Sequence, residues 1–189
     1  MPKAVVPAYL EHFRCDGPRC PDNCCYGSWK IHVDEKHYKR MKKLTDPELK
    51  PLVDRYVKRN RKQPSTSATF GKLVQDYDKG HCAFLADDRR CNLQLKAGAD
   101  HLCDVCMLYP RLDNTIIGRP MERSLSLSCP LAAELALLDP DSLTFHEVDL
   151  NLYGREMTYS FLNPYDNLDK RPEKRYFQNL REFTIQVLR

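Results

Sequence analysis

The chain has 189 residues, of which 42% are hydrophobic and 30% charged, and its formal net charge at pH 7 is +4. This ordinary composition excludes wholesale disorder, and the small net charge gives no case for a nucleic-acid partner. No run approaches the roughly 18 apolar residues that a membrane span needs, and no secretory leader is recognisable. We therefore expect a cytoplasmic protein of one domain, or of one domain with a small appendage.

The N-terminal region combines irregular chain with loops. Residues 1–14 are predicted to form an irregular or extended lead-in. Residues 15–25 are rich in turn formers and predict a loop. A short strand is indicated by three alternating apolar residues, Trp29, Ile31 and Val33.

Two helices are predicted next. Asp34 is the expected N-cap of a helix that runs to about Leu44. Asp46 is the expected cap of a second helix, with Pro47 at its first position. The second helix has a buried stripe at helical spacing, formed by Leu49, Leu52, Val53, Tyr56 and Val57.

The rest of the chain predicts short elements. A strand near 70–74 and a turn at 76–80 precede a cysteine-containing region, 81–111, of short helical turns. Two strands around 118–120, a helix from Cys129 to about Leu138 and a strand at 145–148 follow, and a final apolar stripe predicts a helix over 176–188. Because that helix runs uncapped to the last residue, we expect the chain to be the N-terminal part of a longer protein. The fold class expected is α+β, a small irregular domain of short helices and strands organised around a cysteine-ligated metal centre.

Positive charge is concentrated between residues 36 and 62. This segment has eleven Lys and Arg residues against three acidic ones. Solvated helix faces are the simplest interpretation, an acidic protein partner is the second and nucleic acid the third.

Nine cysteines are the most informative feature: Cys15, Cys20, Cys24, Cys25, Cys82, Cys91, Cys103, Cys106 and Cys129. Disulfides are disfavoured because the number of cysteines is odd and because a cytoplasmic protein keeps its thiols reduced. Cysteines that merely pack in the core would be scattered along the chain, whereas here four lie within eleven residues. The pattern favours thiolate ligation of a metal or cluster.

The ligand spacing favours an iron–sulfur centre over zinc. A structural zinc site typically offers two closely spaced pairs, and here only Cys103 and Cys106 are separated by two residues. A cluster is wider than one ion and accepts ligands from separate segments. Zinc stays open as the alternative. His12, His81 and His101 adjoin cysteines in sequence but are more often surface or core residues than ligands.

Two enzyme signatures are missing. The Cys-x3-Cys-x2-Cys spacing typical of radical S-adenosylmethionine enzymes does not occur, because Cys20-x3-Cys24 is followed at once by Cys25. The seven glycines are dispersed and form no nucleotide-binding loop.

Four motifs in order resemble the flagellin lysine-N-methylase family, a group of cysteine-cluster proteins that chelate zinc or iron. They are Phe13-Arg-Cys15…Cys20…Cys24-Cys25…Trp29, Cys82-Ala-Phe-Leu85…Cys91, Cys106-Met-Leu-Tyr109-Pro110-Arg111 and Ser124-Leu-Ser-Leu-Ser-Cys129-Pro130. The family pattern does not require Cys103, which is therefore interpreted as a spare thiol. The resemblance implies a cluster-binding region over 1–140, followed at 141–189 by a strand and helix that lead into a missing C-terminal region.

The resemblance also implies an activity: methyl transfer from S-adenosylmethionine to surface lysines of flagellin, with a [4Fe–4S] cluster in the enzyme and no nucleic acid or membrane as partner. The implied metal ligands are Cys15, Cys20, Cys24, Cys25, Cys82, Cys91, Cys106 and Cys129. We further hypothesise that Tyr109 accepts a hydrogen bond from the lysine amine and that Arg111 holds the cosubstrate carboxylate. The alternatives are a non-catalytic zinc or iron module and a redox or electron-transfer protein.

Overall fold

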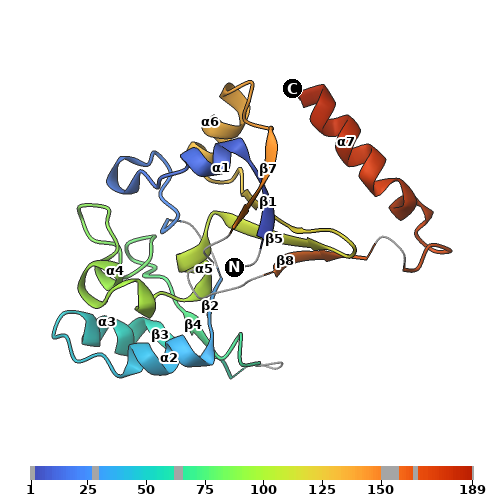
Figure 1. The fold of residues 1–189 in the computed structure, drawn as a ribbon. Helices are drawn as coiled ribbons and strands as arrows, with labels where there is room; N and C mark the ends of the chain where they lie inside the picture. Colours follow the sequence, from blue (N-terminus) through green and yellow to red (C-terminus); the bar gives the residue numbers. More distant parts are fainter. Residues whose placement is uncertain (1–2, 27–29, 62–65, 150–157, 164–165, 189) are drawn as a thin grey trace. The chain divides into compact units, whose positions relative to one another are not determined.

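The computed structural model describes residues 3–26, 30–61, 66–149, 158–163 and 166–188. Two compact units divide the chain: residues 16–109 form one, and residues 1–15 with 110–189 form the other. We call them the inserted unit and the sheet unit. Both mix helices with strands, so the predicted α+β class is confirmed (Figure 1). Among the described residues, no helix is both long enough and apolar enough to cross a bilayer.

The inserted unit is built on a three-stranded antiparallel sheet with the order β2-β4-β3. Its strands are β2 (Ile31–Val33), β3 (Val57–Arg59) and β4 (Gly71–Leu73). Helices α2 (Glu35–Lys42) and α3 (Leu49–Tyr56) lie between β2 and β3 in the chain. The predicted strand at 29–33 is confirmed over its described part, while Trp29 lies outside the described residues.

The predicted start of α2 is confirmed, whereas α3 begins at Leu49 with Glu48 as its N-cap residue, so Pro47 precedes the helix instead of opening it. The Asp34 side chain accepts a hydrogen bond from the His37 backbone N–H at 3.0 Å and so caps α2. The Asp46 carboxylate accepts from the backbone N–H groups of Glu48 and Leu49, both at 2.9 Å, and satisfies donors at the start of α3. The predicted stripe of α3 packs into the core, with Leu49 and Val53 almost fully buried.

The remainder of the inserted unit consists of short turns, as predicted for the region from residue 81 onward. A 3₁₀ turn (Gly17–Arg19) interrupts the first cysteine loop. Helix α4 (Asn92–Ala97), a 3₁₀ turn (Ala99–His101) and α5 (Asp104–Leu108) follow a tight hairpin around residues 85–91. Two cysteines, Cys82 and Cys103, belong to the apolar core of this unit.

The sheet unit has five strands in the order β7-β1-β6-β5-β8. They are β1 (Lys3–Pro7), β5 (Arg111–Ile116), β6 (Met121–Leu125), β7 (Phe145–Asp149) and β8 (Thr158–Leu162). Strand β1 pairs parallel with β6 and antiparallel with β7. The predicted hairpin, the strand at 145–148 and helix α6 (Pro130–Leu138) are confirmed.

The predicted lead-in is extended over residues 3–7, which form a strand inside the sheet, but residues 8–12 form helix α1 (Ala8–His12), which was not predicted. Strand β8 was not predicted. The final helix, α7 (Phe177–Leu188), is confirmed. Its Arg181 donates to Glu122 of β6 at 3.0 Å, and most of its apolar stripe is exposed.

Candidate metal centre

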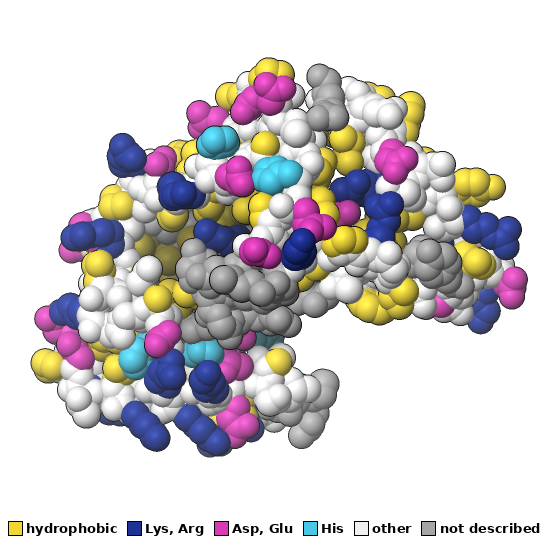
Figure 2. All heavy atoms as spheres, viewed as in Figure 1, with side chains coloured by type: hydrophobic (Ala, Val, Ile, Leu, Met, Phe, Trp, Pro, Cys, Tyr) yellow, Lys and Arg dark blue, Asp and Glu magenta, His cyan; other side chains and the backbone are white. Residues whose placement is uncertain are grey.

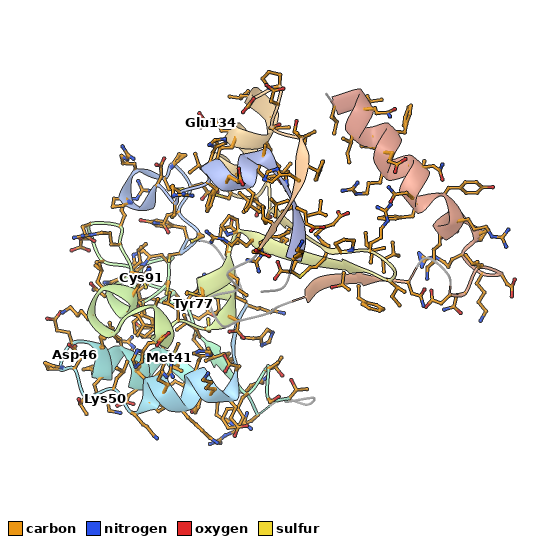
Figure 3. The ribbon with its side chains drawn as sticks, viewed as in Figure 1. Met41, Asp46, Lys50, Tyr77, Cys91 and Glu134 are labelled. Carbon is orange, nitrogen blue, oxygen red and sulfur yellow. The ribbon has the colours of Figure 1, made fainter. Side chains whose placement is uncertain are left out.

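Six thiols of the inserted unit come from three separate segments. Cys24 and Cys25 end the first cysteine loop, and Cys82 and Cys91 flank the hairpin. Cys103 and Cys106 lie at the start of α5, where Cys103 is the N-cap residue. The backbone N–H of Cys82 donates to the Cys25 carbonyl at 2.8 Å, which joins the first two segments. Cys91, labelled in Figure 3, immediately precedes α4.

Cys25 is the centre of the first group of thiols. Hydrogen bonding to Cys25 lowers the pKa of Cys24 to about 7 and also lowers the pKa of Cys82. The same contacts, together with burial, raise the pKa of Cys25. One proton on Cys25 is therefore stabilised by two sulfurs that ionise more easily.

Cys103 and Cys106 form the second group. Their thiols hydrogen-bond to each other, which lowers the pKa of Cys103 and raises that of Cys106. Charge on Cys82 and Cys91 raises the pKa of Cys106 further. Burial raises the pKa of Cys91, and charge on Cys82 and Cys24 adds to the effect. These interactions connect all six thiols.

Such a set of thiols fits a cationic centre. Ionising one member opposes ionisation of the next, so all can be thiolates together only when positive charge lies between them. Four thiolates around zinc, each about 2.3 Å from the ion, would lie about 3.8 Å apart. The group of the described residues whose ligand atoms all lie within 4.8 Å of one another is instead Asp34, His37 and Asp104. Among the described residues, no three cysteine sulfurs therefore form a compact single-ion site.

Five of the eight predicted ligands belong to this group of thiols: Cys24, Cys25, Cys82, Cys91 and Cys106. Cys103, interpreted from the sequence as a spare thiol, is the hydrogen-bond partner of the Cys106 thiol. The two-residue spacing of Cys103 and Cys106 was the signal for this pairing.

The other three predicted ligands are placed differently. The Cys20 thiol lies 3.1 Å from the Asp22 carbonyl oxygen within its own loop. Cys15 and Cys129 belong to the sheet unit, where Cys15 is exposed and Cys129 is the buried N-cap residue of α6.

A group of ionisable side chains adjoins Cys103. The ring of the buried His37 lies 2.5 Å from an Asp34 carboxylate oxygen and 4.0 Å from Asp104, the first residue of α5. Burial would raise the pKa of Asp34, but hydrogen bonds from the His37 backbone and ring outweigh it and lower that pKa. We interpret this group as a support that connects the start of α2 to the start of α5.

The predicted substrate-side residues lie on either side of the boundary between the two units in the sequence. Tyr109 ends α5, and its backbone N–H donates to the Val105 carbonyl at 3.0 Å. Arg111 begins β5, and its guanidinium carbon lies 5.5 Å from the centroid of the Phe13 ring. Tyr109 belongs to the inserted unit and Arg111 to the sheet unit.

Two of the three histidines beside cysteines lie in the inserted unit. His81 uses Nδ1 in a 2.9 Å hydrogen bond with the Cys82 carbonyl and packs edge-on against Tyr26. The Nδ1 atom of His101 is buried and has no hydrogen-bond partner within the described ranges.

Comparison with known proteins identifies relatives. The chain is 32% identical over 141 residues to a lysine-N-methylase of Salmonella choleraesuis and 31% identical to that of Salmonella typhimurium. Each alignment covers 75% of this chain and 34% of the relative, so the chain spans about a third of these methylases. It is also 32% identical to the flagellar biosynthetic protein FliU of Salmonella muenchen and covers 80% of it.

No family model matches the chain, and no solved structure does. The similarity covers the N-terminal portion of the longer relatives and most of FliU. On this evidence the chain belongs to the lysine-N-methylase/FliU family.

Proposed function

We propose that the inserted unit holds a thiolate-ligated [4Fe–4S] cluster and that the chain is part of a protein lysine N-methyltransferase acting on flagellin. The observation that carries the first half is a set of six thiols, from three segments of one unit, that lie near enough to shift one another's pKa values. The second half rests on the membership of the lysine-N-methylase/FliU family.

The cluster would be held by four of six thiolates, those of Cys24, Cys25, Cys82, Cys91, Cys103 and Cys106. A bound cluster supplies cross-links between the cysteine loop, the hairpin and α5, and so adds its binding free energy to the stability of the unit. Cys82 and Cys103 belong to the apolar core, so their sulfurs would bind the cluster from the side that is shielded from solvent. Cys24 and Cys106 belong to solvent-exposed residues.

Methylation of lysine sets a chemical requirement on the chain. With an ordinary pKa of about 10.4, roughly one lysine in 2,500 is neutral at pH 7, and only the neutral amine attacks a methyl sulfonium. The amine must therefore lose its proton near the reacting methyl group. We propose that Tyr109 accepts a hydrogen bond from this amine and that Arg111 binds the carboxylate of S-adenosylmethionine through both guanidinium branches.

The basic surface of α2 and α3 is proposed to bind an acidic region of flagellin. Lys and Arg side chains gather on this side of the inserted unit in Figure 2. Several of these side chains form ion pairs with acidic residues, such as Lys39 with Glu35 at 2.7 Å and Lys50 with Asp54 at 2.9 Å. Lys36 and Lys43 are exposed and have no ion-pair partner in the described part of the chain, which leaves their charge available. Lys62 lies outside the described residues.

The first experiment is to purify the protein without oxygen and to record visible absorption with iron, sulfide and zinc content. A brown protein with about four irons per chain supports the cluster. Mass spectrometry of flagellin after incubation with S-adenosylmethionine then tests the transfer. A colourless protein with stoichiometric zinc would contradict the cluster.

A non-catalytic metal-binding role is the second candidate. The thiols of the inserted unit favour it, because thiolate ligation of a metal needs no cosubstrate site. Cluster-loaded protein that neither binds S-adenosylmethionine nor methylates flagellin would support this role. A reversible redox couple without methylated product would point to electron transfer.

A further inference from the structure

The hairpin that links Cys82 to Cys91 turns through an arginine in the left-handed region of backbone space. The hairpin is closed by hydrogen bonds from the Ala86 N–H to the Arg90 carbonyl and from the Arg89 N–H to the Ala86 carbonyl, both 2.9 Å. Arg89 has φ of 63°. Glycine is the residue that normally occupies such a position in a short hairpin loop, because a side chain there costs energy. A strained non-glycine residue calls for a compensating role.

The Arg89 side chain supplies contacts that glycine would lack. Its Nη2 donates to the backbone carbonyl of Cys20 at 2.6 Å, across 69 residues of sequence. In return, the side-chain amide of the buried Asn23 donates to the Arg89 carbonyl at 3.2 Å. The Asn23 amide oxygen accepts from the Cys25 N–H at 2.9 Å. Arg89 and Asn23 together fix the first cysteine loop against the hairpin.

One donor of Arg89 is left over. Its Nε atom is buried and has no hydrogen-bond partner within the part of the chain that the structure describes. A buried unsatisfied donor is costly, and a guanidinium nitrogen more so because it carries charge. Anionic sulfur is an acceptor that would satisfy it, and hydrogen bonds to the sulfurs of an iron–sulfur centre raise its reduction potential.

We propose that Arg89 is a positioning residue for the metal centre: it holds the Cys20–Cys25 loop in place and gives its buried N–H and its charge to the sulfur ligands. This inference rests on the proposed thiolate centre. The positive charge offsets the negative charge that four thiolates bring to the centre. Reduction adds one more negative charge, so Arg89 favours the reduced state.

The test compares metal-loaded wild type with Arg89→Gln, Arg89→Lys and Arg89→Gly. Iron content, the midpoint potential and the rate of iron loss to a chelator are measured. Arg89→Gln is expected to lower the potential and to speed iron loss about tenfold, in the range seen for outer-shell changes at metal sites. Arg89→Lys keeps the charge but not the planar donor, and should recover part of the potential.

Arg89→Gly separates this role from a structural one. Glycine relieves the backbone strain at φ 63°, so the metal-free protein should keep its thermal stability while the loaded protein loses iron faster. Arg90→Gln is the matched control, because the adjacent Arg90 is exposed and pairs with Asp88 at 2.6 Å. It should leave the potential and the iron loss unchanged.

The outcomes distinguish this inference from the proposal beneath it. Wild-type protein that takes up neither iron nor zinc would overturn the metal centre itself. Wild type that binds iron, with Arg89 variants matching its potential and its rate of iron loss, would overturn the role of Arg89 alone.

Discussion

Arg123 forms a bidentate ion pair with Asp113, in which Nε donates to Oδ1 at 2.5 Å and Nη2 donates to Oδ2 at 2.8 Å. The two residues lie opposite each other on β6 and β5, and both are buried. A paired charge in this setting is tolerable, whereas an unpaired one is very costly. The pair therefore fixes the register of the β5–β6 hairpin.

Arg123→Met should destabilise the sheet unit by about 3–5 kcal/mol, because it leaves the Asp113 carboxylate buried without a partner. Replacing both residues, as Asp113→Leu with Arg123→Met, should restore most of that stability. Urea unfolding measures both effects. Lys3→Met is the control, since the Lys3–Glu147 pair of the same sheet is exposed and its loss should have no measurable cost. A single Arg123→Met variant as stable as wild type would contradict the prediction.

The Tyr56–Asp76 hydrogen bond predicts a pH dependence. The Tyr56 hydroxyl donates to Asp76 at 2.7 Å, and this bond lowers the pKa of Asp76. A carboxyl with a folded-state pKa below its unfolded value of about 3.9 stabilises the fold above that pH. This stabilisation is lost as the pH falls through the folded-state pKa.

Tyr56→Phe should therefore be less stable than wild type at about pH 6, and the difference should shrink below about pH 4. Urea unfolding over this range measures it. Tyr77→Phe is a suitable control, because Tyr77 is 86% exposed and lies on the turn after Asp76 (Figure 3). A stability difference that stays constant down to about pH 2 would count against the assignment to Asp76.

The group of thiols predicts the outcome of a serine scan. Cys24, Cys25, Cys82, Cys91, Cys103 and Cys106 supply the candidate ligands, and serine at a true ligand position should reduce bound metal to below about half of the wild-type content. Cys103→Ser should act like Cys106→Ser, because the two thiols are paired. Anaerobic iron and zinc analysis measures the result.

Met107→Leu is the control for this scan, since Met107 lies beside Cys106 on α5 and packs against the core. It should retain the wild-type metal content. Full metal content in Cys103→Ser would return Cys103 to the status of a spare thiol.

The basic surface predicts a salt-dependent interaction. A Lys36→Gln, Lys43→Gln and Arg55→Gln variant should bind flagellin about tenfold more weakly at low salt, with a smaller difference at high salt. The same charge change on the sheet unit, as Arg119→Gln, Lys170→Gln and Arg175→Gln, is the control. Titration of flagellin at two salt concentrations measures the affinities. Equal binding and equal methylation by both variants would remove this surface from the proposal.

Local signals explain which elements could be predicted. Asp34 and Asp46 use their carboxylates on nearby backbone N–H groups, so each helix start depends on a few adjacent residues. Helix α3 has its stripe at helical spacing and therefore could be recognised from the sequence alone.

Distant pairing explains what could not be predicted. Strand β1 is held by residues more than a hundred positions away, as in Ala4 with Met121 and with Val148. Five residues ending in proline contain no local pattern that requires a strand. The same holds for the candidate metal centre. The cysteines themselves predict thiolate ligation, but the contact between Cys25 and Cys82 depends on how the hairpin packs against the first cysteine loop.

The position of β1 between two later strands has a consequence for synthesis on the ribosome. Both neighbours of β1, β6 and β7, are synthesised after the whole inserted unit. The N-terminal strand must therefore wait unpaired while residues 16–109 already form a continuous unit that can fold. Metal delivered at that stage would reach the thiols of the inserted unit before the five-stranded sheet exists.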